Sequence, residues 1–149
     1  MSIEYSYKVD AHWTEGRRGR VLAEGVTQDL DFSTPPEFHG EPGKWTPEHF
    51  FVAAAVSCFV ATFAVIAEFS KFEALGLEVS ATGTVSKGED GFRFTELELR
   101  PLLTVATEHD HERGLRLLEK TKRSCLVTRS LVTDVRVLPQ VRVTEAVTA

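Results

Sequence analysis

The sequence WTPEHFFVAAAVSCFVATFAVIAEFSK, residues 45–71, forms one long apolar segment with a cysteine near its middle. Thr46 is a typical N-cap, Pro47 suits the first helical position, and Glu48 lies near the positive end of the helix dipole. The segment ends where charged and polar side chains return. This pattern predicts a central helix over residues 46–70, and we expect the remaining segments to pack around it.

A helix that is apolar around its whole circumference must be covered on all sides, either by protein or by lipid. Residues 50–67 carry no charge, and these 18 positions are about the shortest span that crosses a bilayer. However, several alanines make the segment only moderately apolar, and no Lys or Arg cluster flanks it to set a topology. We therefore expect a buried helix wrapped by sheet. Because 149 residues cover such a helix poorly, a second copy of the chain is expected to help.

Length and composition favour one globular domain, since the chain has 149 residues, of which 42% are hydrophobic. A net charge of −5 argues against nucleic-acid binding, and the short run RRGR at residues 17–20 does not reverse this. The first ten residues, MSIEYSYKVD, have no apolar core region, so we expect no secretion signal and a cytoplasmic location. In a reducing compartment, two cysteines favour a transient bond over a permanent structural bridge.

The order of the remaining patterns predicts an α+β fold, with antiparallel sheets wrapped around the central helix. We expect N-terminal strands within residues 1–32, a loop rich in Pro and Gly over residues 33–45, and a β-β-α-α-β region over residues 76–145. In the second strand of that region, the apolar side chains change parity after Phe92 and Phe94. The change predicts a β-bulge near Thr95 or Glu96.

Two shorter patterns give expectations near the ends of the chain. At the N-terminus, a period-two alternation predicts a half-buried strand with Tyr5, Tyr7, Val9 and Ala11 on one face. Near the C-terminus, residues 110–123 predict an amphipathic helix with Leu115 and Leu118 on its buried stripe. Ser124 is the expected N-cap of a further short helix, which would make Cys125 the first residue of that helix.

The two cysteines are the first candidates for chemistry, and their predicted surroundings differ. Cys58 lies in the middle of an apolar helix, where burial raises the pKa of a thiol and the helix dipole is too distant to help. A reactive Cys58 would therefore need a cation from elsewhere. Cys125 would lie where free N–H groups favour a thiolate, with basic side chains at positions 120, 122 and 123 nearby. The simpler interpretation of Cys58 is an unreactive buried cysteine, and that of Cys125 is a small apolar residue at a helix start.

Other candidate groups give weaker signals. The turn sequence GRRGR, residues 16–20, can project a guanidinium inward, although solvated turn arginines are far more common. The histidines do not have the spacing of a zinc site, so we expect no metal and no cofactor. Their positions are His12, His39, His49, His109 and His111. Nucleotide-binding glycine loops and the serine-hydrolase elbow are absent from the sequence.

Two segments, TPEHFFVAAAVSCF (residues 46–59) and KRSCLVTRSL (residues 122–131), resemble the OsmC/Ohr family of osmotically inducible and organic hydroperoxide resistance proteins. The resemblance extends over nearly the whole chain. Many members have Pro directly after the second cysteine, whereas this chain has Leu126. The resemblance implies a thiol-dependent peroxidase in an intertwined homodimer, in which antiparallel sheets wrap two long central helices. It also implies that an external dithiol completes the catalytic cycle.

The same resemblance assigns roles to individual residues. It implies that Cys58 is the peroxidatic cysteine and that Cys125 is the resolving one, so that the two form a transient disulfide. Arg17 best matches the arginine that stabilises the thiolate, with Arg18 as the competing choice, and Glu48 matches the carboxylate that orients it. Aromatic rings near the site would favour an apolar peroxide over hydrogen peroxide. These rings are Phe50, Phe51, Phe59 and Phe63.

Helix geometry limits how Glu48 can act. It precedes Cys58 by ten positions, which corresponds to about 15 Å along a straight helix axis. Glu48 must then act through the long side chain of an arginine, or belong to the active site of the partner subunit.

Two other functions remain open at this point. A member of the same fold without catalysis would bind a small hydrophobic ligand in an apolar pocket. A thioesterase-like enzyme would also be built as a helix wrapped by sheet. A peroxidase requires the Cα atoms of Cys58 and Cys125 to come within about 6 Å of one another.

Overall fold

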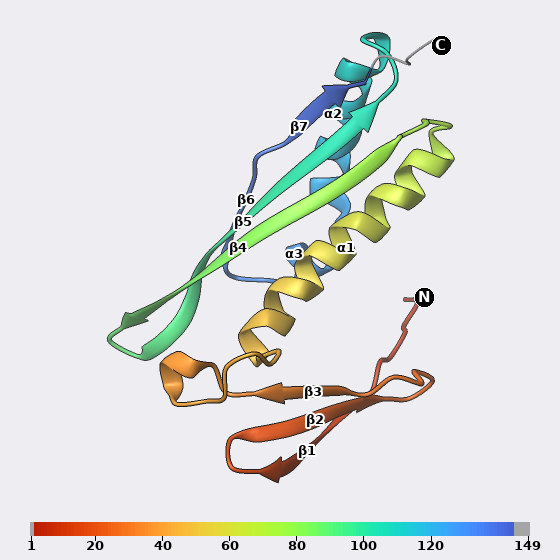
Figure 1. The fold of residues 1–149 in the computed structure, drawn as a ribbon. Helices are drawn as coiled ribbons and strands as arrows, with labels where there is room; N and C mark the ends of the chain where they lie inside the picture. Colours follow the sequence, from red (N-terminus) through yellow and green to blue (C-terminus); the bar gives the residue numbers. More distant parts are fainter. Residues whose placement is uncertain (1, 145–149) are drawn as a thin grey trace. The chain divides into compact units, whose positions relative to one another are not determined.

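The structure is a computed structural model that describes residues 2–144 (Figure 1). The chain forms two compact units, Met1–Phe51 and Val52–Ala149. Each unit has its own β-sheet, and long helices occur alongside the strands, so the predicted α+β class is confirmed.

The first unit is built on a three-stranded antiparallel sheet. Its strands are β1 (Val9–Glu15), β2 (Arg18–Ala23) and β3 (Leu30–Ser33), in the order β1-β2-β3. Gly16 adopts a φ of 54° at the β1–β2 turn, a backbone region that glycine enters at little cost. The predicted loop follows β3 and contains one short 3-10 helix, η1 (Pro36–Phe38).

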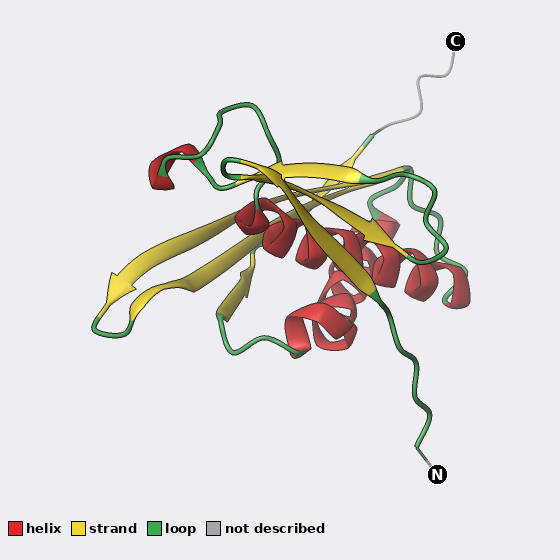
Figure 2. Ribbon diagram, turned by 90° about the horizontal axis from the view of Figure 1, so that it is seen from below, coloured by secondary structure: helices red, strands yellow, loops and turns green. Residues whose placement is uncertain are grey.

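The N-terminal strand differs from its prediction. Residues 2–8 run as a loop ahead of β1 (Figure 2), and the strand begins only at Val9. Tyr5 and Tyr7, expected to be half-buried, are 80% and 91% exposed. The alternation in this segment is real, but nothing within residues 2–144 covers its apolar side.

Helix α1 (Pro47–Phe69) agrees with its prediction to within one residue at each end. Thr46 caps it as expected, because its hydroxyl oxygen accepts the backbone N–H of His49 at 3.1 Å. In return, Nδ1 of His49 accepts the backbone N–H of Thr46 at 3.1 Å. This reciprocal pair is a capping box in which histidine occupies the position usually held by Glu or Gln.

A four-stranded mixed sheet forms the second unit. A long antiparallel hairpin joins β4 (Gly76–Gly88) to β5 (Gly91–Val105), as Figure 1 shows. Two short strands, β6 (Asp134–Val137) and β7 (Gln140–Val143), pair with β5 in parallel. Parallel pairs thus extend the expected antiparallel sheet along β5.

Two irregularities in this sheet have local causes. Thr84 pairs with Glu96 while Val85 pairs with Phe94, so Thr95 is the extra residue of a β-bulge, as the change of parity predicted. The single expected C-terminal strand is divided at Pro139, which has no backbone N–H to donate to a ladder.

The core of the second unit lies between the sheet and two helices, α1 and α2 (His109–Ser124). Alternate side chains of β5 face this core, and the helices contribute apolar rings and leucines. Its members include Ala55, Phe59, Phe63, Leu97, Leu99, Leu103, Val105, Leu117 and Leu118. Leu118 was expected on the buried stripe of α2, but Leu115 is only half-buried and Leu117 takes its place.

Truncating Leu118 should destabilise the protein strongly, because this side chain is fully buried and its removal leaves a cavity. We expect Leu118→Ala to lower the free energy of unfolding by about 2–5 kcal/mol. Denaturant unfolding at fixed protein concentration measures the change. The matched control is Val132→Ala, at a position that is 94% exposed, where the change should stay within about 0.5 kcal/mol. Equal losses in the two variants would contradict the assigned core.

Helix α1 is long and apolar enough to cross a membrane by length and composition alone. The core helix of a soluble protein passes the same test. Only 28% of its most apolar window is buried in the single chain, and the sequence had led us to expect that one chain covers this helix poorly. Val65 and Phe69, for example, are 50% and 84% exposed.

Candidate active site

The Cys58 sulfur is surrounded by hydrogen-bond donors of the second unit. Cys58 is half-buried on α1, and the hydroxyl of Thr62, one helical turn later, lies 3.8 Å from its Sγ. The backbone of Val127 and Leu126 and the side chain of Cys125 lie near enough to lower the pKa of this thiol by hydrogen bonding. The two cysteines are therefore neighbours in the folded unit, and both are free thiols.

The donors outweigh the effect of burial on the Cys58 thiol. Burial is the largest single influence and raises the pKa, as expected for a sulfur in apolar surroundings. The hydrogen bonds from Val127, Cys125, Thr62 and Leu126 act in the opposite direction, and their sum holds the pKa of Cys58 below its ordinary value. These uncharged donors were not part of the sequence-based expectation, which looked to an imported cation to offset burial; that cation stays a prediction.

Cys125 occupies the junction between two helices. It is fully buried, with φ −63° and ψ 112°, and it ends α2 and caps α3 (Leu126–Arg129). Ser124 is the last residue of α2, so the prediction of Ser124 as the cap is off by one residue. The backbone amides at the start of α3 lower the pKa of Cys58, whereas the sequence had associated them with Cys125.

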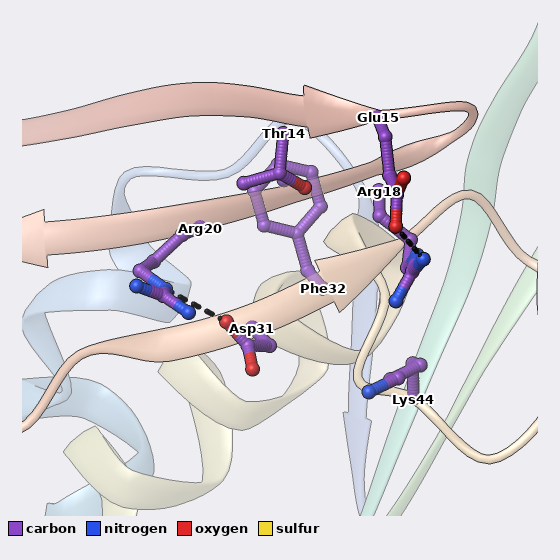
Figure 3. A pocket seen from close by; sticks show the side chains of 8 residues that line it. Thr14, Glu15, Arg18, Arg20, Asp31, Phe32 and Lys44 are labelled. Atoms are coloured by element: carbon purple, nitrogen blue, oxygen red, sulfur yellow. Dashed lines mark hydrogen bonds and ion pairs between the residues drawn. The ribbon is translucent and has the colours of Figure 1, made fainter.

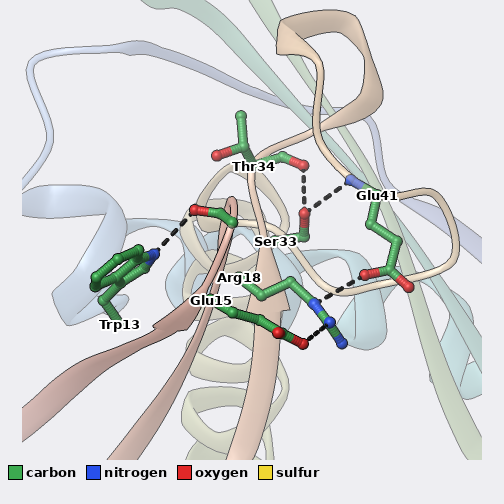
Figure 4. Close-up of polar contacts among 7 residues, drawn as sticks. Trp13, Glu15, Arg18, Ser33, Thr34 and Glu41 are labelled. Carbon is green, nitrogen blue, oxygen red and sulfur yellow. Dashed lines mark hydrogen bonds and ion pairs between the residues drawn. The ribbon is translucent and has the colours of Figure 1, made fainter.

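The turn between β1 and β2 is held by its own hydrogen bonds (Figure 4). The indole N–H of Trp13 donates to the carbonyl of Gly16 at 2.9 Å. The backbone N–H of Thr34 donates to the carbonyl of Arg17 at 3.0 Å. These bonds hold the backbone around Arg17, and they do not involve its exposed side chain.

The two candidate arginines, Arg17 and Arg18, differ in their ion pairs. Arg18 pairs with Glu15 and, at 3.2 Å, with Glu41. Arg20 pairs with Asp31 at 2.9 Å, and its hydrogen bond holds the pKa of that carboxyl below the usual value. Figure 3 shows side chains from both clusters lining one pocket. The charge of Arg18 is thus already offset by neighbouring carboxylates.

Arg17 and Glu48 are in the opposite situation. Within residues 2–144 the guanidinium of Arg17 makes no ion pair and no side-chain hydrogen bond. The carboxylate of Glu48, half-buried in the first turn of α1, is likewise unpaired in the described chain. Both groups are therefore available for a further contact.

The candidate substrate-binding rings have different environments. Phe50 stacks on Trp45 with ring centroids 6.0 Å apart and meets the edge of Phe32 at 6.3 Å. Phe51 is half-buried. Phe59 is only 1% exposed and belongs to the core, so its ring supports the structure from inside.

The sequence-predicted residues fall into both units. Those in the first unit are Arg17, Glu48, Phe50 and Phe51, and those in the second are Cys58, Cys125 and Phe59. The fold brings the two cysteines together. Sequence reasoning missed Thr62, although its spacing of four from Cys58 places both on one helix face. It could not find the α3 amides, because their contact with Cys58 depends on tertiary packing.

The histidines form no metal-binding group in the part of the chain that is described. No three or more His, Cys, Asp or Glu side chains of residues 2–144 are placed to hold a metal ion. His111 lies 3.7 Å from Glu112 at the surface. His49 completes the cap of α1, so its role here is structural.

Comparison with solved structures relates this fold to known proteins. An OsmC-like protein of unknown function, VCA0330 from Vibrio cholerae O1 biovar eltor str. N16961, superposes with a TM-score of 0.81 at 18% identity. The match covers 91% of this chain and 99% of that one. An organic hydroperoxide resistance protein from Elizabethkingia anophelis superposes with a TM-score of 0.77 at 23% identity, covering 97% and 100%. At these identities the likeness establishes the fold alone.

Sequence comparison identifies the family. The uncharacterized protein YmaD of Bacillus subtilis (strain 168) is 25% identical over 132 residues, covering 86% of this chain and 87% of YmaD. The family profile of OsmC-like proteins matches residues 39–138, more than half of the chain. The predicted resemblance is confirmed, and the chain belongs to the OsmC/Ohr family of OsmC-like proteins.

Proposed function

We propose that this chain is a thiol-dependent peroxidase that reduces organic hydroperoxides to alcohols, with Cys58 as the attacking thiolate. The observation that carries the proposal is the surroundings of the Cys58 sulfur. Its pKa is held below the ordinary value, and the side chain of Cys125 hydrogen-bonds to it. A thiolate is the nucleophilic form of cysteine, and a second thiol beside it allows a disulfide to close. The name of the Elizabethkingia relative points to the same class of substrate.

The chemistry proceeds in two steps and a reduction. The Cys58 thiolate attacks the distal peroxide oxygen, the O–O bond breaks, and the alkoxide takes a proton and leaves as an alcohol. Cys58 is now a sulfenic acid. The Cys125 thiol attacks its sulfur, water leaves, and a disulfide forms. An external dithiol reduces this bond by thiol–disulfide exchange and restores both thiols.

We assign to Arg17 the stabilisation of the thiolate and of the charge that develops on the leaving alkoxide. Its exposed and unpaired guanidinium supports this choice over Arg18, which carboxylates already neutralise. Glu48 is the carboxylate that would orient Arg17. A buried or half-buried glutamate without a partner is costly, so an arginine contact would also stabilise it.

A homodimer is part of the same proposal. The apolar side of α1 is exposed in the single chain, with Val65 and Phe69 as examples. The N-terminal segment likewise exposes Tyr5 and Tyr7. Large exposed apolar side chains of this kind are typical of a protein interface. A second copy would cover these side chains and would bring a second Arg17 and Glu48 into the assembly.

The aromatic side chains favour an apolar peroxide over hydrogen peroxide. Phe50 and Phe51 are half-buried, whereas Phe59 belongs to the core of the second unit. We place the enzyme in the cytoplasm, because a disulfide that must be reopened in every turnover needs a supply of reduced dithiol.

The proposal is tested by mixing the protein with cumene hydroperoxide and dithiothreitol and following peroxide consumption. We expect catalytic turnover. The kcat/KM for cumene hydroperoxide should exceed that for hydrogen peroxide by at least about tenfold, because an apolar pocket binds the larger apolar group more tightly. Peptide mapping without reductant should find a Cys58–Cys125 disulfide after oxidation. Consumption no faster than with dithiothreitol alone would contradict the proposal.

A further inference from the structure

One arginine of α2 contacts the C-terminal end of α1. The helix ends in a Schellman motif, in which Lys71 takes a left-handed φ of 52° and the N–H of Phe72 donates to the carbonyl of Ala67 at 2.9 Å. The carbonyl of Ser70, inside this motif, accepts a hydrogen bond from the guanidinium of Arg113. The same guanidinium lies 5.4 Å from the centroid of the Phe72 ring. Arg113 therefore makes two contacts with the end of α1.

Both contacts suit a guanidinium in partly dry surroundings. The last carbonyls of a helix lack partners inside it and carry a partial negative charge, which favours a cation. A planar guanidinium can also lie against an aromatic face while its N–H groups donate elsewhere. Arg113 is half-buried and Phe72 is only 6% exposed, so water competes weakly for these contacts. The arginine thus ties α2 to one defined point of α1.

The position of this tie along the chain relates it to the two cysteines. In the second unit α1 and α2 run in opposite directions (Figure 1). Ser70 follows Cys58 by twelve positions, and Cys125 follows Arg113 by twelve positions. Twelve positions correspond to about 18 Å along a helix. Cys125 is buried in the core against which Cys58 packs, and the two side chains are neighbours. The helices therefore meet at two places that lie equally far apart on each of them.

Equal spacing means that one register satisfies both meeting places. Sliding α2 along α1 by one turn, about 5.4 Å, would break the Arg113 contacts and separate the cysteines. A disulfide tolerates little of this, since its Cα atoms lie only about 4.4–6.8 Å apart. Apolar contact between the helices is not directional, whereas a hydrogen bond depends on distance and angle. The tie at Arg113 is therefore suited to hold the register that the cysteines need.

We propose that Arg113 is a positioning residue that sets the register of α2 against α1, so that Cys58 and Cys125 stay within reach of a disulfide. It touches neither sulfur and acts through the two helices. The catalytic consequence rests on the proposed function, whereas the register can be measured without peroxide.

Three variants of the full-length chain test the proposal. Arg113→Met removes the donor and the charge but keeps an unbranched apolar stem. Arg113→Lys keeps a cation that can donate to the carbonyl of Ser70. Arg116→Met is the matched control, because Arg116 is an exposed arginine of the same helix, three positions later.

The first readout is the equilibrium constant for formation of the Cys58–Cys125 disulfide in mixtures of reduced and oxidised dithiothreitol. The two thiols lose two electrons and two protons, and oxidised dithiothreitol takes them up as it opens to the dithiol. Acid quenching followed by peptide mapping gives the disulfide fraction at each mixture. No peroxide takes part in this measurement.

We expect Arg113→Met to lower this equilibrium constant about five- to twentyfold, because helices that can slide hold the thiols at a lower effective concentration. Arg113→Lys should recover most of the loss, and Arg116→Met should stay within about twofold of wild type. A wild-type value in Arg113→Met, an equal loss in Arg116→Met, or no recovery in Arg113→Lys would overturn the proposal. Circular dichroism checks each fold. If Arg113→Met does not fold, Arg113→Gln, whose side chain is shorter but polar, replaces it.

A single turnover with cumene hydroperoxide separates positioning from a general loss of structure. In Arg113→Met the sulfenic acid at Cys58 should form at the wild-type rate, and its conversion to the disulfide should be about five- to twentyfold slower. Equal slowing of both steps would show a merely structural role and overturn the proposal.

The two proposals can fail separately. A shifted dithiothreitol equilibrium in a protein that does not consume peroxide would support the role of Arg113 and end the peroxidase assignment. Peroxide turnover with the same equilibrium constant in wild type and Arg113→Met would leave the peroxidase assignment standing and overturn the role of Arg113.

Discussion

Replacing Cys58 with Ser is expected to lower the rate of cumene hydroperoxide reduction by at least about 1,000-fold, because the reaction loses its nucleophile. A serine hydroxyl at this position stays protonated near neutral pH and does not attack a peroxide oxygen. Stopped-flow fluorescence of the reduced protein, mixed with peroxide in the absence of dithiol, measures the single oxidation step. The substitution exchanges one atom in a half-buried side chain, so the fold should be retained.

The matched control for this variant is Cys125→Ser. It retains the nucleophile and should therefore consume about one equivalent of peroxide per chain and stop at the sulfenic acid, which a dimedone-type reagent traps. Its turnover with dithiothreitol should fall while its first oxidation persists. Equal oxidation rates in wild type and Cys58→Ser would remove Cys58 from the reaction. A Cys125→Ser variant that does not react at all would indicate that Cys125 has more than a resolving role.

Local patterns predicted the parts of the fold whose side chains carry their own signal. The Thr46 cap and the uncharged run after it defined α1 closely, because cap and burial act on the same segment. The change of parity around Thr95 located the bulge, because a one-residue insertion shifts every later side chain to the other face. These features depend on neighbours in sequence or on one adjacent strand.

Features that depend on distant segments were not predicted. The parallel pairing of β6 and β7 with β5 joins residues far apart in sequence, and alternation alone does not set strand direction. The alternation of Tyr5 and Tyr7 was taken for a half-buried strand, yet the single chain leaves both exposed. The period of a pattern indicates that a face is apolar without indicating what covers it.

In the candidate site, too, some residues could be predicted from the sequence and others depend on the tertiary fold. The resemblance to the family supplied Cys58 and Cys125, and the structure brings their side chains into hydrogen-bonding contact. The sequence associated the amides after Ser124 with Cys125, since the two are adjacent along the chain. In the folded unit they influence Cys58 instead, since Cys58 and Val127 both pack against the same core. Spatial neighbours, which the sequence does not reveal, decide which thiol is activated.

Removing the guanidinium of Arg17 should be the second most damaging change. We expect Arg17→Ala to lower the rate of Cys58 oxidation by roughly 100-fold, as for the loss of one preorganised charge-stabilising donor. It should also raise the Cys58 pKa, measured by alkylation against pH. Arg18→Ala is the matched control from the same turn. Its ion pairs with Glu15 and Glu41 are largely exposed, so its loss should change the rate by no more than about threefold.

A mixed dimer locates the arginine that serves each sulfur. Differently tagged Arg17→Ala and Cys58→Ser chains are combined, and the heterodimer is purified by both tags. If Arg17 acts on the sulfur of the other subunit, one site of the heterodimer is intact, and activity should return to about half that of wild type. If Arg17 acts within its own chain, both sites carry a lesion, and activity should be about half that of the Arg17→Ala homodimer. An active Arg17→Ala homodimer would show instead that the uncharged donors around Cys58 are sufficient and that this arginine was wrongly chosen.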